Sequence, residues 1–317
     1  MGRKKIILDC DPGMDDSMAI IMACKSEALE VMAITAASGN YPVDVTSKNA
    51  LKILELIGRS EIPVGRGMSE PMVRKRPKDP FTHGEDGQAE NNLPDPATPL
   101  CPRHAVELII DTVKAHPGEV FILCTGPMSN VAMAMKQAPE IKPMIAGIYA
   151  ISGAFGLNRY AYANATGDTP QSEWNVYVDP EAAEIVYKSG VKLVALGLDV
   201  ATHFDVNLTD KDIHMLEQSQ RPEAKFFLQA IRFVNERGFE AYCAVIDCMA
   251  VGYAIDPTLV KTFAGHVGIE TKDGLTLGMT VLDSRHHFVW EDLPVVEIGE
   301  SANYERFLKL LMGIVLA

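Results

Sequence analysis

The sequence predicts an α/β protein built on an open, mostly parallel sheet with helices on both faces and a helical lid region. Two observations support this fold class. Short apolar segments alternate with segments whose apolar residues recur at helical spacing, which is typical of a doubly wound parallel sheet. Polar residues also gather directly after several apolar segments, and open α/β sheets bind their ligands at the carboxyl ends of strands.

The N-terminal segment 5–24 joins a strand, a turn and a helix. Ile6–Leu8 is a short apolar strand, and Pro12-Gly13 is a turn signal. An apolar helix follows, with Met18 and Met22 one turn apart. Between these apolar parts the segment holds four carboxylates, Asp9, Asp11, Asp15 and Asp16.

These four acids predict a cation site. Asp15 and Asp16 fall in the first helical turn, where the helix dipole favours negative charge. Residues two apart in a strand share a face, so Asp9 and Asp11 should point the same way. The alternative is that the acids cap the helix or are solvated in the loop. Capping explains one or two of them, whereas four mutually repelling acids favour a divalent counter-charge.

The alternation continues through the first half of the chain. Residues 66–102 interrupt it, because they are rich in Pro, Gly, Asp and Asn and show neither the strand pattern nor the helix pattern. A loop this long is usually functional, so we interpret it as a lid or rim near the site. The regular elements expected here are strands at 30–36, 61–65, 119–124 and 145–151, and helices at 44–57, 103–115 and 128–137.

The second half begins with a polar loop at 152–172, followed by a helix at 180–189 that starts at Pro180. A strand is expected at 191–198, and residues 208–256 are mostly helical. Asp273-Gly274 lies between two β-prone runs within 268–283 and predicts a hairpin. The last elements expected are strands near 286–297 and a helix near 302–315.

Composition limits the classes of partner. The formal net charge of −13 argues against nucleic acid and anionic membranes, which attract basic proteins. No apolar run approaches the roughly 18–20 residues that span a bilayer. The six cysteines form no CxxC pair and no signal peptide is visible, which predicts a reducing, cytoplasmic location. Without repeats or a linker, residues 1–317 are expected to form a single domain.

Asp247 is the second anchor of the predicted site. It is a lone acid in the apolar segment 241–255, which we expect to be one buried helix. A buried unpaired carboxylate is either protonated or costs several kcal/mol. A hydrogen bond to a neighbouring helix end is the alternative, but a cation shared with the N-terminal acids explains the residue more economically.

Several segments, in order, resemble the inosine-uridine-preferring nucleoside hydrolase family. They are DxDPGxDD at the N-terminus, ITAASGN (34–40), HGEDG (83–87), TGPMSN (125–130), EWNVYVDPEAA (173–183), Asp247 and LTLGMTV (275–281). The resemblance implies a single nucleoside hydrolase-like domain with a Rossmann-like core. It also implies metal-dependent hydrolysis of the N-glycosidic bond of ribonucleosides to ribose and free purine or pyrimidine base, by a homodimer or homotetramer.

By the same resemblance, the metal ligands are the side chains of Asp11, Asp16 and Asp247 and the backbone carbonyl of Thr125. All of these ligand atoms are oxygens, which suits Ca²⁺ better than zinc. Asp11 is the candidate general base, taking a proton from a metal-bound water as it attacks the ribose. Excess negative charge would favour the oxocarbenium-like transition state.

The resemblance assigns the ribose contacts to Asp15, Asn40, Asn164, Glu173 and Asn175. Ordinary turn chemistry is the alternative for the asparagines. The interval from Asn164 to Glu173 is longer than in the family, and an alternative alignment would use Asn158 in place of Asn164.

The sequence departs from the family where a histidine usually precedes the last metal aspartate, because that position is Ile246. Isoleucine cannot donate a proton to the leaving base. His83 is the candidate leaving-group acid, with a solvent-exposed loop histidine as the alternative. Tyr242 and Asp168 are weaker candidates, and Trp174 either stacks on the base or packs in the core.

Two other functions stay open at this stage. One is a non-catalytic or weakly active nucleoside- or ribose-binding protein that keeps the metal and sugar contacts. The other is a phosphatase of the haloacid dehalogenase type, which also begins with DxD after an apolar strand. That class usually has Thr or Val two residues after the second Asp, whereas this chain has Gly13 there.

Overall fold

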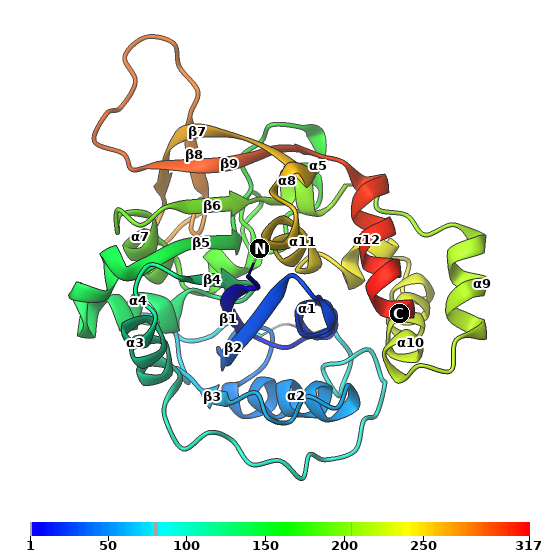
Figure 1. Ribbon diagram of the computed structural model, residues 1–317. Coiled ribbons are helices and arrows are strands. Elements are labelled where there is room, and N and C mark those ends of the chain that lie inside the picture. The colour runs from blue at the N-terminus through cyan, green and yellow to red at the C-terminus, as the bar shows by residue number, and fades with distance from the viewer. Residues whose placement is uncertain (1, 79–81, 204) are drawn as a thin grey trace.

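A nine-stranded sheet forms the centre of the computed structural model, which describes residues 2–78, 82–203 and 205–317 (Figure 1). Its order is β3-β2-β1-β4-β5-β6-β9-β7-β8. Among the strands of the described residues, β7 alone runs opposite to the others, so the prediction of an open, mostly parallel sheet is confirmed. The strands are β1 (Lys4–Cys10), β2 (Leu29–Ala36), β3 (Val64–Arg66), β4 (Val120–Cys124), β5 (Ile145–Ile151), β6 (Leu193–Leu196), β7 (Val260–Ile269), β8 (Thr280–Asp283) and β9 (Val295–Ala302).

Helices cover both faces of the sheet, as predicted, because the buried strands are apolar on both sides. In β1, Ile6 and Leu8 pack into one core cluster and Ile7 into the other. The first face carries α1 (Met14–Lys25), α2 (Val43–Leu56), α10 (Pro222–Glu236), α11 (Cys248–Ile255) and α12 (Tyr304–Leu316). The second carries α3 (Ala105–Ala115), α4 (Ser129–Gln137) and α7 (Pro180–Tyr187).

The expected continuous helix at 241–255 is wrong. A 3-10 turn, η2 (Ala241–Ala244), is separated from α11 by three residues, and Asp247 lies at the start of α11. A carboxylate is favoured at a helix N-terminus by the dipole, whereas in the middle of a buried helix it would have no donor nearby. Because of this break, the Asp247 side chain lies at the N-terminus of α11 and not in the middle of a helix.

Four other expectations need correction or refinement. The polar loop at 152–172 contains α5 (Arg159–Ala163), because the Asn158 side chain accepts from the Tyr160 amide (2.9 Å) and starts a helix. The strand expected to reach residue 198 ends at Leu196, and α8 (Leu198–Ala201) follows Gly197. Residues 286–294 form no strand. β7 and β8 do pair as a hairpin, but residues 270–279 connect them in place of a two-residue turn.

The long segment after β3 contains no helix or strand between residues 67 and 100, among its described residues, as predicted; residues 79–81 lie outside them. It packs on the body of the protein through Gln88, which donates to Ser17 Oγ (3.0 Å) in α1. Its Thr82 and His83 reach the cavity described below, which supports the interpretation as a rim. None of the described helices has both the length and the apolar character that crossing a bilayer requires.

Candidate active site

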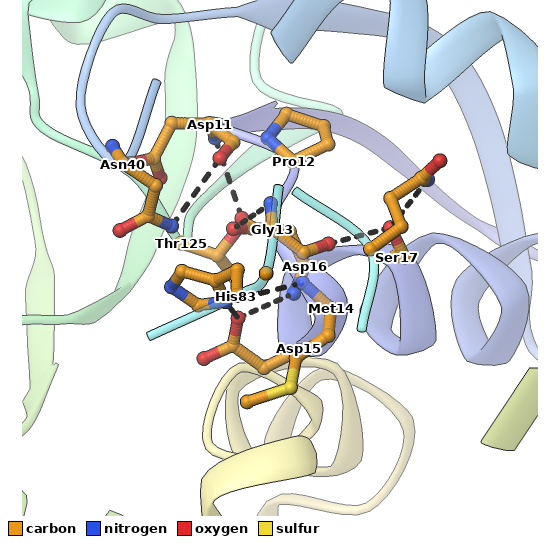
Figure 2. A network of polar contacts seen from close by, with 12 residues as sticks. Asp11, Pro12, Gly13, Met14, Asp15, Asp16, Ser17, Asn40, His83 and Thr125 are labelled. Atoms are coloured by element: carbon orange, nitrogen blue, oxygen red, sulfur yellow. Dashed lines mark hydrogen bonds and ion pairs between the residues drawn. The ribbon is translucent and has the colours of Figure 1, made fainter. Parts of the chain in front are cut away.

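The polar residues that follow β1, β2 and β4 meet at one edge of the sheet (Figure 2). Asp11 follows β1, Asn40 follows β2 and Thr125 follows β4. The pairing of the strands continues just beyond their ends, because the Thr125 amide donates to the Asp9 carbonyl (2.9 Å). Adjacent parallel strands therefore deliver these three residues to the same point.

Asp16 is the hub of this edge. Its Oδ1 accepts hydrogen bonds from the Thr125 hydroxyl (2.8 Å) and the Asp11 amide (3.3 Å), and its Oδ2 from the Gly13 amide (3.3 Å). Asp11 is held separately, since its Oδ2 accepts from the Asn40 amide (2.6 Å). The other Asp11 oxygen, Oδ1, is buried without a hydrogen-bond partner.

Asp247 joins the N-terminal acids although more than two hundred residues separate them. Carboxylate oxygens of Asp15, Asp16 and Asp247 all lie within 4.8 Å of one another, and all three residues are buried. The backbone amide of Asp11 donates a hydrogen bond to Asp16 Oδ1 (3.3 Å) at the same place. The structure therefore brings Asp247 to the N-terminal acids, in a geometry that can hold a cation. The group of closely spaced carboxylates contains Asp15, which the sequence analysis assigned to the ribose, in place of Asp11.

Burial and mutual repulsion disfavour the charged forms of these acids in the absence of a cation. Burial and then Asp16 raise the pKa of Asp11 well above its usual range. Burial, followed by Asp15, Asp16 and Asp11, does the same to the pKa of Asp247. Burial and Asp15 raise the pKa of Asp16 to about 7, although its hydrogen bonds oppose the shift.

Asp9 does not share the environment of Asp11. Its Oδ1 accepts from the Thr35 hydroxyl (2.6 Å) and the Asn130 side chain (2.9 Å), so it points to the α4 side of the sheet. The expectation that the two acids point the same way is wrong, because β1 ends at Cys10 and the chain turns before Asp11. Asp9 thus ties β1 to β2 and α4 beneath the site.

A cavity of about 440 Å³ opens above the acids. Asp11 and Asp16 are fully buried and hydrogen-bond to the lining residues Asn40 and Thr125. Eight of the predicted site residues line the cavity: Asp15, Asn40, His83, Thr125, Asn164, Glu173, Asn175 and Asp247. None of the described lining residues is Lys or Arg. The cavity is therefore acidic at its base, and His83 is the one ionisable nitrogen side chain among its described lining residues.

Glu173 and Asn175 are held in place by backbone groups. Glu173 begins the short helix α6 (Trp174–Val178), and its carboxylate accepts from the amides of Gly153, Asn175 and Val176. Burial nevertheless raises its pKa to about 7. Asn175 donates to the carbonyl of Thr125 (2.8 Å), which joins this wall to the acidic base.

The structure distinguishes between the two asparagines proposed for the sugar site. Asn164 lines the cavity and donates to the Thr202 carbonyl (3.0 Å). Asn158 does not line it, because that side chain starts α5 and donates to the Asp199 carbonyl (2.7 Å). The alignment through Asn158 is therefore not supported.

His83 is a buried residue of the cavity wall, so the alternative of a solvent-exposed loop histidine is wrong. Its Nδ1 accepts from the Met14 amide (3.3 Å) and lies 3.6 Å from an oxygen of Asp15. A Cβ on Gly13 would come within 2.5 Å of the His83 ring, so glycine at this turn allows the close approach. Since Nδ1 accepts, Nε2 is the nitrogen that carries the proton in the neutral ring.

Some residues at the site were not predicted from the sequence. Thr202, Phe239 and Cys243 line the cavity, but none belongs to a recognisable motif. Asp199 acts behind the wall, accepting from the amides of Phe155 (2.8 Å) and Leu157 (2.7 Å). Asp199 is an acid within an apolar segment, and this is the same kind of signal that identified Asp247, so the sequence could have predicted it.

An open α/β sheet whose strand ends surround a buried group of carboxylates defines an α/β protein with an acidic ligand site. The sequence profile described as inosine-uridine preferring nucleoside hydrolase matches residues 6–309. A pyrimidine-specific ribonucleoside hydrolase RihA from Citrobacter koseri is 35% identical over 312 residues, covering 96% of each chain. A pyrimidine-specific ribonucleoside hydrolase RihB from Escherichia coli O1:K1 / APEC is 36% identical over 288 residues, covering 89% of this chain and 88% of that protein.

Solved structures agree with these relatives. A plant nucleoside hydrolase, PpNRh1, matches with a TM-score of 0.88 at 29% identity, covering 99% of both chains. A purine-preferring ribonucleoside hydrolase from Gardnerella vaginalis matches with a TM-score of 0.85 at 30% identity, covering 98% of both chains. The chain belongs to the inosine-uridine preferring nucleoside hydrolase family, whose members hydrolyse N-glycosidic bonds of ribonucleosides. This family is one of enzymes, which disfavours both the binding-protein and the phosphatase alternatives.

Replacing Gly126 by Ala should displace the Asp11 carboxylate, because a Cβ there would lie 2.6 Å from Asp11 Oδ1. Since misplacing a reacting group by about 1 Å can cost on the order of 100-fold, we expect kcat/KM for ribonucleosides to fall by about that factor. Steady-state kinetics would measure it, with Gly313→Ala as the matched control, because nothing lies within 4 Å of that added Cβ. Wild-type kinetics in Gly126→Ala would contradict the placement of Asp11 at the reacting centre.

Proposed function

We propose that this chain hydrolyses the N-glycosidic bond of ribonucleosides in the acidic cavity, with Asp11 as general base and Ca²⁺ as cofactor. The observation that carries the proposal is the convergence of Asp247 with Asp15 and Asp16, from two distant segments, at a cavity lined by the predicted sugar-binding residues. Asp11 lies next to this group, because its amide donates to Asp16 Oδ1. Pyrimidine ribonucleosides are the proposed preferred substrates, supported by the specificity in the names of the relatives from Citrobacter koseri and Escherichia coli.

The donor set fits a divalent cation. Asp11 Oδ1 is buried without a hydrogen-bond partner, which is costly unless the oxygen binds a ligand. The proposed ligands are carboxylates of Asp11, Asp16 and Asp247 with the carbonyl of Thr125, and oxygen donors suit Ca²⁺. Three carboxylates against two positive charges leave the site with excess negative charge. A cation bound here would orient a water molecule and make it more acidic.

The protein's own residues then have separate tasks. Asp11 takes the proton of the attacking water, as a buried carboxylate with one oxygen held by the Asn40 amide and the other available. Positive charge develops on the ribose ring as the glycosidic bond breaks. The buried carboxylates stabilise that charge, because electrostatic interactions are strong in a site from which water is excluded.

The ribose hydroxyls are proposed to bind Asp15, Asn40, Asn164, Glu173 and Asn175, all of which line the cavity. Hydrogen bonds to backbone groups hold the side chains of Glu173 and Asn175 in fixed positions before substrate arrives. A sugar that failed to pair with one of these buried groups would lose about 1–3 kcal/mol of binding. This requirement favours ribonucleosides over sugars that lack a hydroxyl.

The leaving base needs a proton from a group other than residue 246, which is Ile246 on the cavity wall. His83 is the proposed acid, because it is buried in the wall and its Nε2 is the nitrogen left to donate. Tyr242 and Asp168 also line the cavity and are weaker proposals for this role. Trp174 lies on the same wall, which supports stacking on the base.

The proposal also covers the domain organisation, the oligomeric state and the cellular location. We infer that residues 1–317 act as a single domain, that the active form is a homodimer or homotetramer, and that the enzyme is cytoplasmic. The cytoplasmic location is supported by the six cysteines, all of which are free thiols in the structure.

A panel of purine and pyrimidine ribonucleosides, assayed for released ribose with Ca²⁺ present, tests the function. We expect hydrolysis without phosphate, fastest for pyrimidines, and a loss of at least about 1,000-fold in Asp11→Asn, because a neutral amide cannot act as the base. Asp95→Asn, which alters an exposed acid that does not line the cavity, is the control. The absence of ribose release from every nucleoside would leave a binding protein as the better description.

The His83→Ala variant tests the leaving-group acid. General acid catalysis typically contributes about 100- to 10,000-fold, so kcat should fall by that order for natural nucleosides. It should fall much less for a ribonucleoside analogue whose leaving group needs no protonation, such as a nitrophenyl riboside. Equal losses on the two substrates, or no loss on either, would remove His83 from this role.

Calcium should stabilise the protein more at about pH 8 than at about pH 5, since metal ions compete with protons for carboxylates. Burial raises the folded-state pKa of Asp16 and Glu173 to about 7, above their unfolded values of roughly 4. The stability that these groups give the metal-free protein is therefore present at low pH and lost as the pH rises through about 7. Thermal unfolding with and without Ca²⁺ measures this; a calcium shift independent of pH, or retained in Asp247→Asn, would contradict it.

A further inference from the structure

Arg76 contacts the wall of the acidic cavity from outside, because it is not among the described residues that line the cavity. Its Nη1 donates to the backbone carbonyls of Pro77 (2.8 Å), Gly39 (3.2 Å) and Asn40 (3.5 Å). Asn40 lines the cavity and lies beside Asp11 (Figure 2). A positive charge is therefore bound to the turn that follows β2, directly behind a residue of the site.

A single peptide group joins Arg76 to Asp11. The carbonyl of Gly39 and the amide of Asn40 belong to the same planar peptide group, in which the C=O and the N–H point in opposite directions. Arg76 donates to the carbonyl of this group, and Asp11 Oδ2 accepts from its amide (2.6 Å). The result is a chain of two hydrogen bonds that runs from the guanidinium through one peptide to the carboxylate.

The two hydrogen bonds of this chain strengthen each other. A donor that binds the carbonyl of a peptide polarises the group, which makes its N–H a better donor. The first donor here is a cation, and hydrogen bonds from charged donors are stronger than those from neutral ones. The dipole of the peptide also suits both charges, since its C=O faces Arg76 and its N–H faces Asp11. Arg76 should therefore strengthen the bond that holds Asp11 Oδ2.

The Asp11 carboxylate has little room to move independently of this peptide. A Cβ on Gly39 would lie 2.1 Å from Asp11 Oδ2 and 2.8 Å from Cδ of Pro127. On the other side, a Cβ on Gly126 would lie 2.6 Å from Asp11 Oδ1. The carboxylate is thus enclosed between two backbone turns, so a displacement of the peptide between Gly39 and Asn40 is passed on to Asp11.

The backbone that carries Arg76 is fixed by contacts outside the cavity. Its amide donates to Glu70 Oε2 (3.1 Å). Two residues earlier, Arg74 forms ion pairs with Glu181 (2.6 Å) and Asp273 (2.7 Å). None of these partners is among the described residues that line the cavity. The position of Arg76 is therefore set before substrate binds.

We propose that Arg76 is a positioning residue for the hydrolase reaction. It holds the Asp11 carboxylate by Oδ2, through the peptide between Gly39 and Asn40, and this leaves Oδ1 available for the reaction. The inference rests on the proposed role of Asp11 as general base. Because Arg76 acts through Asp11 and not on the substrate, its loss should affect kcat more than KM.

Steady-state kinetics on a ribonucleoside test this role with Arg76→Ala. We expect kcat to fall about 10-fold, less than the roughly 100-fold that a displacement of about 1 Å costs, with KM changed by about two-fold or less. Arg76→Lys should recover most of the rate, because an ammonium group can donate to the same carbonyl, and millimolar guanidinium ion should partly rescue Arg76→Ala. Lys75→Gln is the matched control, since it removes the same charge from the adjacent, exposed residue.

The result that would overturn the proposal is a kcat in Arg76→Ala equal to that of wild type or of Lys75→Gln. A loss that appears entirely in KM would also overturn it, because Arg76 would then act on substrate binding and not through Asp11.

Nuclear magnetic resonance gives a second test that does not need turnover. In metal-free protein labelled with ¹⁵N-asparagine, the amide proton of Asn40 should move upfield in Arg76→Ala, because its hydrogen bond to Asp11 weakens. General loosening of the fold would instead move many asparagine amides together. An unchanged Asn40 resonance would overturn the proposal. If wild type hydrolysed no ribonucleoside, the proposed function would fail, whereas this measurement would still decide whether Arg76 acts on the Asn40 amide.

Discussion

The repulsion among buried carboxylates is the physical constraint on which the rest of the site depends. Asp11, Asp16 and Asp247 lie together out of water, and the walls described by the structure bring no Lys or Arg to them. Without a counter-ion, such a cluster is stable only if it binds protons, and the raised pKa values express this cost. A divalent cation removes the cost and at the same time creates the field that the reaction needs.

The fold keeps this cluster together by using parallel strands and one helix terminus. β1 and β4 end side by side, so Asp11 and Thr125 meet without any flexible segment between them. The first turn of α1 contributes Asp16, whose Oδ1 accepts hydrogen bonds from both of those residues. Asp247 completes the group because α11 begins directly after that residue instead of continuing from the preceding turn. Each acid is thus fixed by an element end.

Periodicity and turn signals predicted most of the sheet and the helices that cover it. They failed where local sequence preference and tertiary contacts differ. The apolar run around Asp247 has the composition of one helix, yet the carboxylate requires a helix start. Residues 284–294 have strand-forming side chains such as Val289 and Trp290, but no neighbouring strand pairs with them.

The candidate site was predictable where a residue type conflicts with its surroundings, as an acid in an apolar segment does. The resemblance to a family placed the polar residues that have no such conflict, including Asn40 and Asn175. Thr202 and Phe239 carry no local signal, because only the folding of distant segments brings them to the cavity. The separate destinations of Asp9 and Asp11 likewise depend on the residue at which β1 ends.

A crystal structure of the protein grown with Ca²⁺ tests the central claim most directly. The account predicts an ion in contact with carboxylate oxygens of Asp11, Asp16 and Asp247 and with the carbonyl of Thr125, at distances of about 2.3–2.6 Å. The account would be contradicted by an ion bound elsewhere. It would also be contradicted if crystals grown at saturating Ca²⁺ showed the three carboxylates together with no ion density between them.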